Sequence, residues 1–140
     1  MDWKYVKKLE NKNLVNDFLN SNGIRIPKAL IELIEKYNGG RPFKKCFDTD
    51  AHKECVFKTL LSYNPKDIET IYKVYREGSD TMFIEMKLYP IASDPFGNFI
   101  CVDLRQGENI VLLRMETLAV EKAADNITDF INKLYWLTVD

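Results

Sequence analysis

The sequence predicts one α+β domain in which helices flank an antiparallel sheet. Three observations support this fold class. The N-terminal half carries apolar residues at helical spacing, the stretch from Met82 to Met115 alternates between apolar and polar residues, and the C-terminal end returns to helical spacing. No linker, repeat or low-complexity tract separates these parts. We therefore expect residues 1–140 to form a single domain.

Four helices are predicted from apolar stripes and their flanking residues. The first three cover residues 11–22, 27–37 and 64–77, and each is followed by a glycine, which commonly ends a helix. The fourth begins after Asn126, a residue suited to cap a helix N-terminus. Its expected core-facing residues are Ile127, Phe130, Ile131 and Leu134.

The predicted sheet is an antiparallel meander. An exposed loop at residues 41–54 leads into a short strand at 55–62, and four further strands follow at 82–87, 88–93, 99–104 and 110–115. Asp94-Pro95-Phe96-Gly97 has the residue order of a type I turn, and residues 106–109 form the next reversal.

The charge balance excludes several function classes. Twenty basic and 21 acidic residues give a net charge of −1, so we expect no direct nucleic-acid partner. No apolar run approaches the roughly 20 residues of a membrane helix, and the N-terminus lacks the features of a signal peptide. The three cysteines, Cys46, Cys55 and Cys101, are an odd number, which fits reduced thiols and a cytoplasmic protein.

Residues 46–55 match neither a metal-site pattern nor a nucleophile pattern. The spacing from Cys46 to His52 to Cys55 lacks the paired short cysteine spacings of structural zinc sites, and nothing nearby supplies an oxyanion hole. We therefore expect no metal and no cofactor. Asp48, Asp50 and Glu54 then indicate an exposed acidic loop.

Two other features have simple interpretations. Gly39-Gly40-Arg41-Pro42 lacks the spacing of a phosphate-binding loop, so its glycines are expected to end a helix. Arg41, Lys44 and Lys45 form a brief basic patch that is typical of a solvated surface.

The meander also carries four carboxylates. Asp94 and Glu108 belong to predicted turns, which leaves Asp103 and Glu116 as a pair without a structural role. A metal-dependent hydrolase that uses Asp94, Asp103, Glu116 and His52 is the weaker functional alternative.

Two segments resemble a known family. Residues 26–42, with a proline-initiated helix that ends in Asn38-Gly39-Gly40, and residues 88–104, with Asp94-Pro95-Phe96-Gly97-Asn98 between strands, resemble the SUKH superfamily of Smi/Knr-type domains. The resemblance implies an antiparallel sheet flanked by helices. It implies toxin-neutralising immunity proteins in bacteria and cell-wall regulation in fungi. Met115-Glu116 stands where relatives often show His-Glu, so any role of that histidine does not carry over.

The expected function is that of a non-catalytic immunity protein that binds a cognate toxin, expected to be a nuclease; a regulatory scaffold is the alternative. Phe96 fits either an exposed anchor or a core residue, and the sequence does not predict the oligomeric state. The expected partner-binding residues are Asp48, Asp50, Glu54, Asp94, Phe96, Asn98, Asp103 and Glu116.

Overall fold

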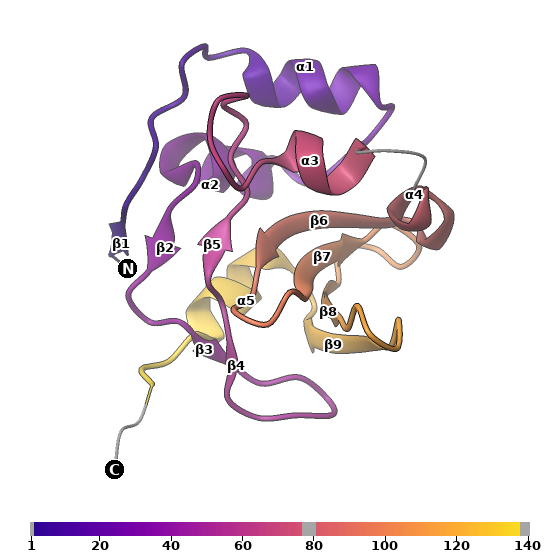
Figure 1. Ribbon diagram of the computed structural model, residues 1–140. Coiled ribbons are helices and arrows are strands. Elements are labelled where there is room, and N and C mark those ends of the chain that lie inside the picture. Colours follow the sequence, from indigo (N-terminus) through magenta and orange to yellow (C-terminus); the bar gives the residue numbers. More distant parts are fainter. Residues whose placement is uncertain (1, 77–80, 138–140) are drawn as a thin grey trace.

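The computed structural model describes residues 2–76 and 81–137 and has an α+β architecture (Figure 1). Helices α1, α2 and α3 gather above the sheet in this view, and α5 lies behind it. The helices are α1 (Leu14–Ser21), α2 (Lys28–Tyr37), α3 (Ile71–Arg76), α4 (Met82–Met86) and α5 (Ile127–Lys133). The strands are β1 (Trp3–Lys4), β2 (Arg41–Pro42), β3 (Cys46–Phe47), β4 (Cys55–Val56), β5 (Thr59–Leu60), β6 (Leu88–Ser93), β7 (Phe99–Asp103), β8 (Ile110–Leu113) and β9 (Val120–Ala124).

The main sheet is a five-stranded antiparallel meander in the order β5-β6-β7-β8-β9. This confirms the predicted fold class and three of the predicted strands. Every residue of β6 and β8 is buried, because side chains from the helices and loops cover the sheet. Two small hairpins, β1 with β2 and β3 with β4, flank it.

The C-terminal helix α5 closes the core as predicted. The Asn126 side chain accepts a hydrogen bond of 2.8 Å from the Asp129 backbone N–H, which caps the helix. Phe130 is only 1% exposed, and its ring lies 5.1 Å from Phe47 and 6.1 Å from Phe57. Burial of this aromatic cluster fixes α5 against β3 and the chain that follows β4.

Two predicted elements were wrong. The strand predicted at 82–87 is instead helix α4, Met82–Met86, because a run of five or six mainly apolar residues does not distinguish the two. Of the described residues in the predicted helix at 64–77, those at 64–70 are not helical and Ile71–Arg76 is, and Ile68 is 83% exposed instead of facing the core. The glycine predicted to stop that helix, Gly78, lies outside the described residues.

The region from residue 41 to 62 is more structured than predicted. The predicted loop contains β2 and β3, and the predicted strand at 55–62 divides into β4, which pairs with β3, and β5, which pairs with β6. Strand β9 was not predicted. All three cysteines are free thiols, and no helix among the described residues is long and apolar enough to cross a membrane.

We expect Phe130→Ala to lower the free energy of unfolding by about 3–5 kcal/mol, because it removes a fully buried ring from a packed cluster. Urea denaturation measures the effect. Phe96→Ala is the matched control, since Phe96 is 79% exposed and its loss should change stability by less than about 0.5 kcal/mol. An unchanged denaturation midpoint for Phe130→Ala would contradict the docking of α5.

Candidate functional site at the acidic loop

Three segments that carry predicted site residues meet at one end of the sheet. The acidic loop (residues 48–54) joins β3 to β4, the first turn (residues 94–98) joins β6 to β7, and the second turn (residues 114–119) joins β8 to β9. Because Phe99 pairs with Leu113, the two turns are neighbours. The acidic loop meets them through hydrogen bonds to β9 and to residues near it.

A buried carboxylate, Glu121 of β9, holds the acidic loop to the sheet. Its side chain is 7% exposed. Glu121 accepts hydrogen bonds from Thr49 Oγ1 at 2.7 Å and Arg114 Nε at 3.0 Å, and His52 Nδ1 lies 3.0 Å from its second oxygen. One buried group therefore joins the loop, β9 and the second turn.

The environment of Glu121 keeps this carboxylate charged. Burial raises the pKa of a carboxyl group, but the hydrogen bonds from Arg114, Thr49 and His52 outweigh burial and lower the pKa of Glu121 to about 2. The charged form is thus stabilised by the residues that it anchors.

The backbone adds further hydrogen bonds that fix the acidic loop. The Asp50 backbone N–H donates to the Lys122 carbonyl oxygen at 2.8 Å, and the His52 backbone N–H donates to Thr49 Oγ1 at 3.0 Å. The first of these bonds covers part of the free edge of β9, the last strand of the sheet.

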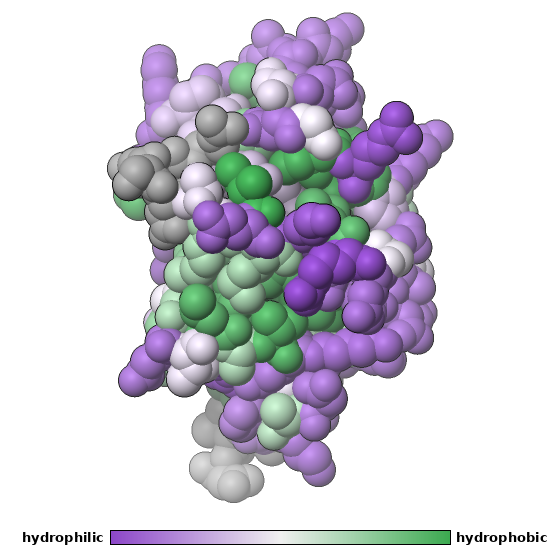
Figure 2. Space-filling model, turned by 90° about the vertical axis from the view of Figure 1, so that its right-hand side faces the viewer, coloured by the Kyte–Doolittle hydropathy of each residue, from purple (hydrophilic) through white to green (hydrophobic). Residues whose placement is uncertain are grey.

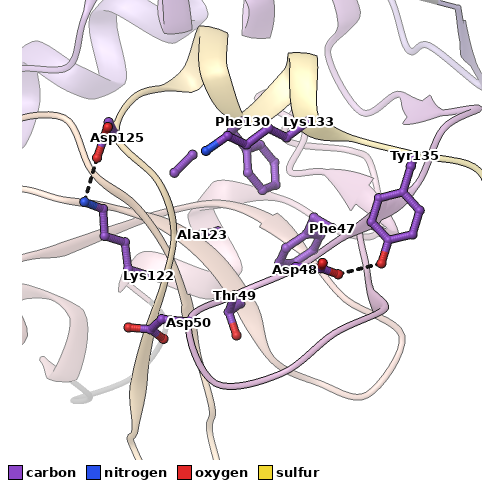
Figure 3. A pocket seen from close by; sticks show the side chains of 11 residues that line it. Phe47, Asp48, Thr49, Asp50, Lys122, Ala123, Asp125, Phe130, Lys133 and Tyr135 are labelled. Carbon is purple, nitrogen blue, oxygen red and sulfur yellow. Dashed lines mark hydrogen bonds and ion pairs between the residues drawn. The ribbon is translucent and has the colours of Figure 1, made fainter.

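Asp48 has a partly structural role (Figure 3). Tyr135 donates its hydroxyl hydrogen to Asp48 Oδ1 at 2.6 Å, and the Glu54 backbone N–H donates to the same oxygen at 3.1 Å. The hydrogen bond from Tyr135 lowers the pKa of Asp48, and its counterpart raises the pKa of Tyr135 to about 12. Asp48 and Asp50 border a pocket of about 510 Å³ above Phe47 and Phe130, with Lys122 and Asp125 ion-paired at its far side.

The first turn is held by two buried side chains. Asp94 Oδ1 accepts hydrogen bonds from the backbone N–H groups of Phe96 and Asn98, at 2.8 and 2.7 Å, and Asn98 Oδ1 accepts one from Met115 at 2.9 Å. Both polar side chains are at most 9% exposed, whereas Phe96 is 79% exposed. Asp94 and Asn98 therefore shape the turn, and Phe96 projects from it as an exposed aromatic residue.

The acidic loop and the two turns enclose a pocket of about 480 Å³. His52 reaches it from the loop, Phe96 and Asn98 from the first turn, and Arg114 and Glu116 from the second. Of these residues, sequence reasoning had singled out His52, Phe96, Asn98 and Glu116, and the fold brings all four to this pocket.

Asp103 lies at the other end of the sheet. It follows four residues after Phe99 along β7 and pairs with Leu88, so roughly 13 Å of strand separates it from the turns. Burial opposes its charge, but bonds from Arg105 lower the pKa of Asp103. The hydrolase set of Asp94, Asp103, Glu116 and His52 is not assembled. Among residues 2–76 and 81–137, no group of three His, Cys, Asp or Glu residues is arranged to hold a metal ion.

Most of the chain matches the model of a known protein family. A family model, SUKH_6, described as SMI1-KNR4 cell-wall, matches residues 12–131. The chain belongs to this SUKH family. In the SUKH domain, the match covers the acidic loop, both turns and Glu121. No curated protein and no solved structure matches the chain.

Met115 and Glu116, which stand where the family resemblance led us to expect a His-Glu pair, lie in the second turn. Met115 is partly buried and donates its backbone N–H to Asn98, and Glu116 is exposed at the rim of the 480 Å³ pocket. The imidazole at this pocket comes from His52 of the acidic loop. Sequence reasoning missed Glu121, Arg114 and Tyr135, and the one signal for Glu121 was an isolated acidic residue in the short run Val120–Ala124.

A second surface feature of the SUKH domain is a hydrophobic area on the side where α4 lies (Figure 2). On α4, Ile84 is 43% exposed, and Met82 and Met86 are partly buried. A substitution in this area can serve as a control for substitutions in the candidate site.

We expect Glu121→Gln to destabilise the protein by about 3 kcal/mol, because it removes the charge that Arg114 and the acidic loop bind. Urea denaturation at pH 7 measures the loss. Glu116→Gln is the matched control, since Glu116 is exposed and has no hydrogen-bond partner among the described residues.

The pH dependence follows from the lowered pKa of Glu121. Its stabilising contribution is fully present above its ordinary value of 4.5 and is lost as the pH falls toward about 2. The wild type should therefore lose more stability over this interval than Glu121→Gln. Equal losses in the two proteins would contradict the anchoring role.

Proposed function

We propose that this SUKH domain is an immunity protein that binds a toxin domain and blocks its activity in the cytoplasm. The proposed docking surface consists of the acidic loop and the two turns around the 480 Å³ pocket. The observation that carries the proposal is an exposed acidic loop that a buried carboxylate, Glu121, fixes to the sheet.

Fixation of the loop favours a binding role. A loop that is already ordered loses little conformational entropy when a partner binds, so more of its contact energy contributes to affinity. The buried residues hold the surface in place, while Asp50 and Glu54 extend from it. Neither of these two side chains makes a hydrogen bond or ion pair with any residue that the structure describes.

The charge of the loop supports a nuclease as the target. A nuclease cleft is positively charged because it holds phosphates, and exposed carboxylates increase the rate and specificity of association with such a surface. Lys53 in the same loop offsets one of its negative charges. Glu116 at the pocket rim adds one further carboxylate to the proposed docking surface. Phe96 adds an aromatic group of the kind that anchors protein interfaces.

A regulatory scaffold is the second candidate function, favoured by the cell-wall wording in the description of the matching family. A scaffold has several weak partners, whereas an immunity protein has one tight partner. Titration against a candidate toxin domain from a neighbouring gene, followed by a toxin activity assay, distinguishes the two. Stoichiometric binding with loss of toxin activity supports immunity, and full toxin activity in the presence of excess protein contradicts it.

The double variant Asp50→Asn/Glu54→Gln should bind the toxin domain at least tenfold more weakly and with a smaller dependence on salt concentration. Its stability should change by no more than about 0.5 kcal/mol per site. The control is Glu10→Gln/Glu108→Gln, which removes two exposed carboxylates outside the site. We omit Asp48 from the test because its bonds to Tyr135 and Glu54 make it structural as well. Unchanged affinity and salt dependence would remove the acidic loop from the interface.

Phe96→Ala should weaken toxin binding by roughly tenfold or more, because an exposed aromatic anchor contributes about 1–2 kcal/mol or more to an interface. Calorimetric titration measures the change. Ile84→Ala should have no effect, since Ile84 is 43% exposed on α4, outside the docking surface. The reverse result would place the interface at α4.

A further inference from the structure

A separate pocket lies beside β5, whose Thr59 pairs with Ser93, the residue that precedes the first turn. It has a volume of about 610 Å³ and is bordered by the N-terminal segment, the chain around Gly39, strand β5 and residues 66–69. In Figure 1, β1, β2 and β5 follow one another from the left edge toward the centre, and the loop between β3 and β4 is at the bottom. Tyr5 and Lys7 of this pocket precede the residues that match the SUKH family.

The pocket carries an excess of positive charge. Lys7, Arg41 and Lys66 line it, and none of them forms an ion pair with a residue that the structure describes. Of its two acidic residues, Glu69 is paired with Lys58 Nζ at 2.6 Å, whereas Asp67 accepts a hydrogen bond of 2.5 Å from the neutral Ser62 hydroxyl and keeps its charge. Three unpaired cations therefore face one unpaired carboxylate, which leaves a net positive charge for an incoming anion.

A buried framework holds the walls of this pocket together. Asn38 is fully buried, and its side chain donates to the Lys7 carbonyl oxygen at 2.8 Å and to Ser62 Oγ at 3.0 Å. The Lys7 backbone N–H donates in turn to the Asn38 carbonyl oxygen at 2.7 Å. Gly39 has a φ of +66°. A Cβ atom added at Gly39 would lie 3.2 Å from the Lys7 side chain. The glycines that end α2 thus also allow Lys7 to lie across the pocket wall.

Aromatic and apolar groups accompany the cations. The Arg41 guanidinium lies 5.6 Å from the centre of the Tyr5 ring, and Tyr5 is 65% exposed. Leu60 contributes to the lining, and Ile68 is 83% exposed at its border. Because large exposed apolar residues beside free cations favour a ligand that is both anionic and apolar, the surface fits an acidic residue next to an apolar one.

We propose that this cationic pocket is a second protein-binding site, which captures a partner segment carrying a carboxylate beside an apolar side chain. Lys7, Arg41 and Lys66 bind the carboxylate, and Tyr5 and Ile68 contact the apolar group. None of the residues that line this pocket belongs to the acidic loop. The proposal can therefore fail without contradicting the proposed immunity function, and the reverse also holds.

The test uses the full chain and three probes: a fluorescent peptide of alternating Glu and Leu, the same peptide with Gln in place of Glu, and a single-stranded oligonucleotide. The Glu–Leu peptide should bind at least tenfold more tightly than the Gln–Leu peptide and the oligonucleotide. Binding should shift the backbone NMR signals of Tyr5, Gly39 and Ile68 and weaken as salt concentration rises.

Matched variants locate the binding. Lys7→Ala/Arg41→Ala/Lys66→Ala should weaken peptide binding at least tenfold, and Ile68→Ala should weaken it severalfold. Lys12→Ala/Arg25→Ala/Lys28→Ala, which removes the same charge from exposed positions elsewhere, should have little effect. Absence of peptide binding, equal binding of the Glu and Gln peptides, tighter binding of the oligonucleotide, or an equal loss in both triple variants overturns the proposal.

Discussion

The ion pair and hydrogen bonds of buried Glu121 are the constraint on which the arrangement of this end of the molecule depends. A carboxylate that is removed from water requires partners, and here those partners come from two other chain segments. Arg114 belongs to the second turn, whereas Thr49 and His52 belong to a loop more than sixty residues earlier. Without this charge, little else would hold the loop beside β9. Apart from the bonds to Glu121, the hydrogen bond from the Asp50 backbone N–H to Lys122 is the only one between the loop and that strand among the described residues.

The site separates residues that hold the surface from residues that face solvent. Asp94, Asn98 and Glu121 are buried and hydrogen-bonded, and they define the shape of the turns and the loop. Phe96, Glu116 and Asp50 are exposed at the positions that this framework creates. Such a surface suits recognition of a partner more than catalysis, because its exposed polar groups are not drawn together around one reacting atom.

Local patterns predicted the parts of the fold that local forces determine. The cap at Asn126, the proline and glycines around α2, and the alternation in β6, β7 and β8 each have a short-range physical cause, and these elements formed where expected. Strand β9 was missed because Glu121 and Lys122 interrupt its apolar pattern, although pairing with β8 stabilises it. Glu121 was missed for the same reason, because it lies in this unpredicted strand. Helix α4 was mistaken for a strand since five residues carry too little periodicity to decide.

The exposed members of the candidate site, Asp50, Glu54, Phe96 and Glu116, were among the predicted residues, because turn and loop chemistry is visible in sequence. Their placement at one end of the sheet was not predictable, since it requires the register of Phe99 against Leu113 and the contact of the loop with β9. Asp103 shows the converse: its acidic character suggested a site, but the hairpin places it at the far end of the sheet beside Arg105.

Hydrogen exchange of the backbone amides in the free protein and in its complex with the toxin domain tests the central claim most directly. The account predicts that binding slows exchange in the acidic loop and in the two turns at 94–98 and 114–119, and leaves α4 unchanged. Protection confined to α4, or to the N-terminal segment and residues 66–69, would contradict the placement of the toxin-binding surface at the acidic loop.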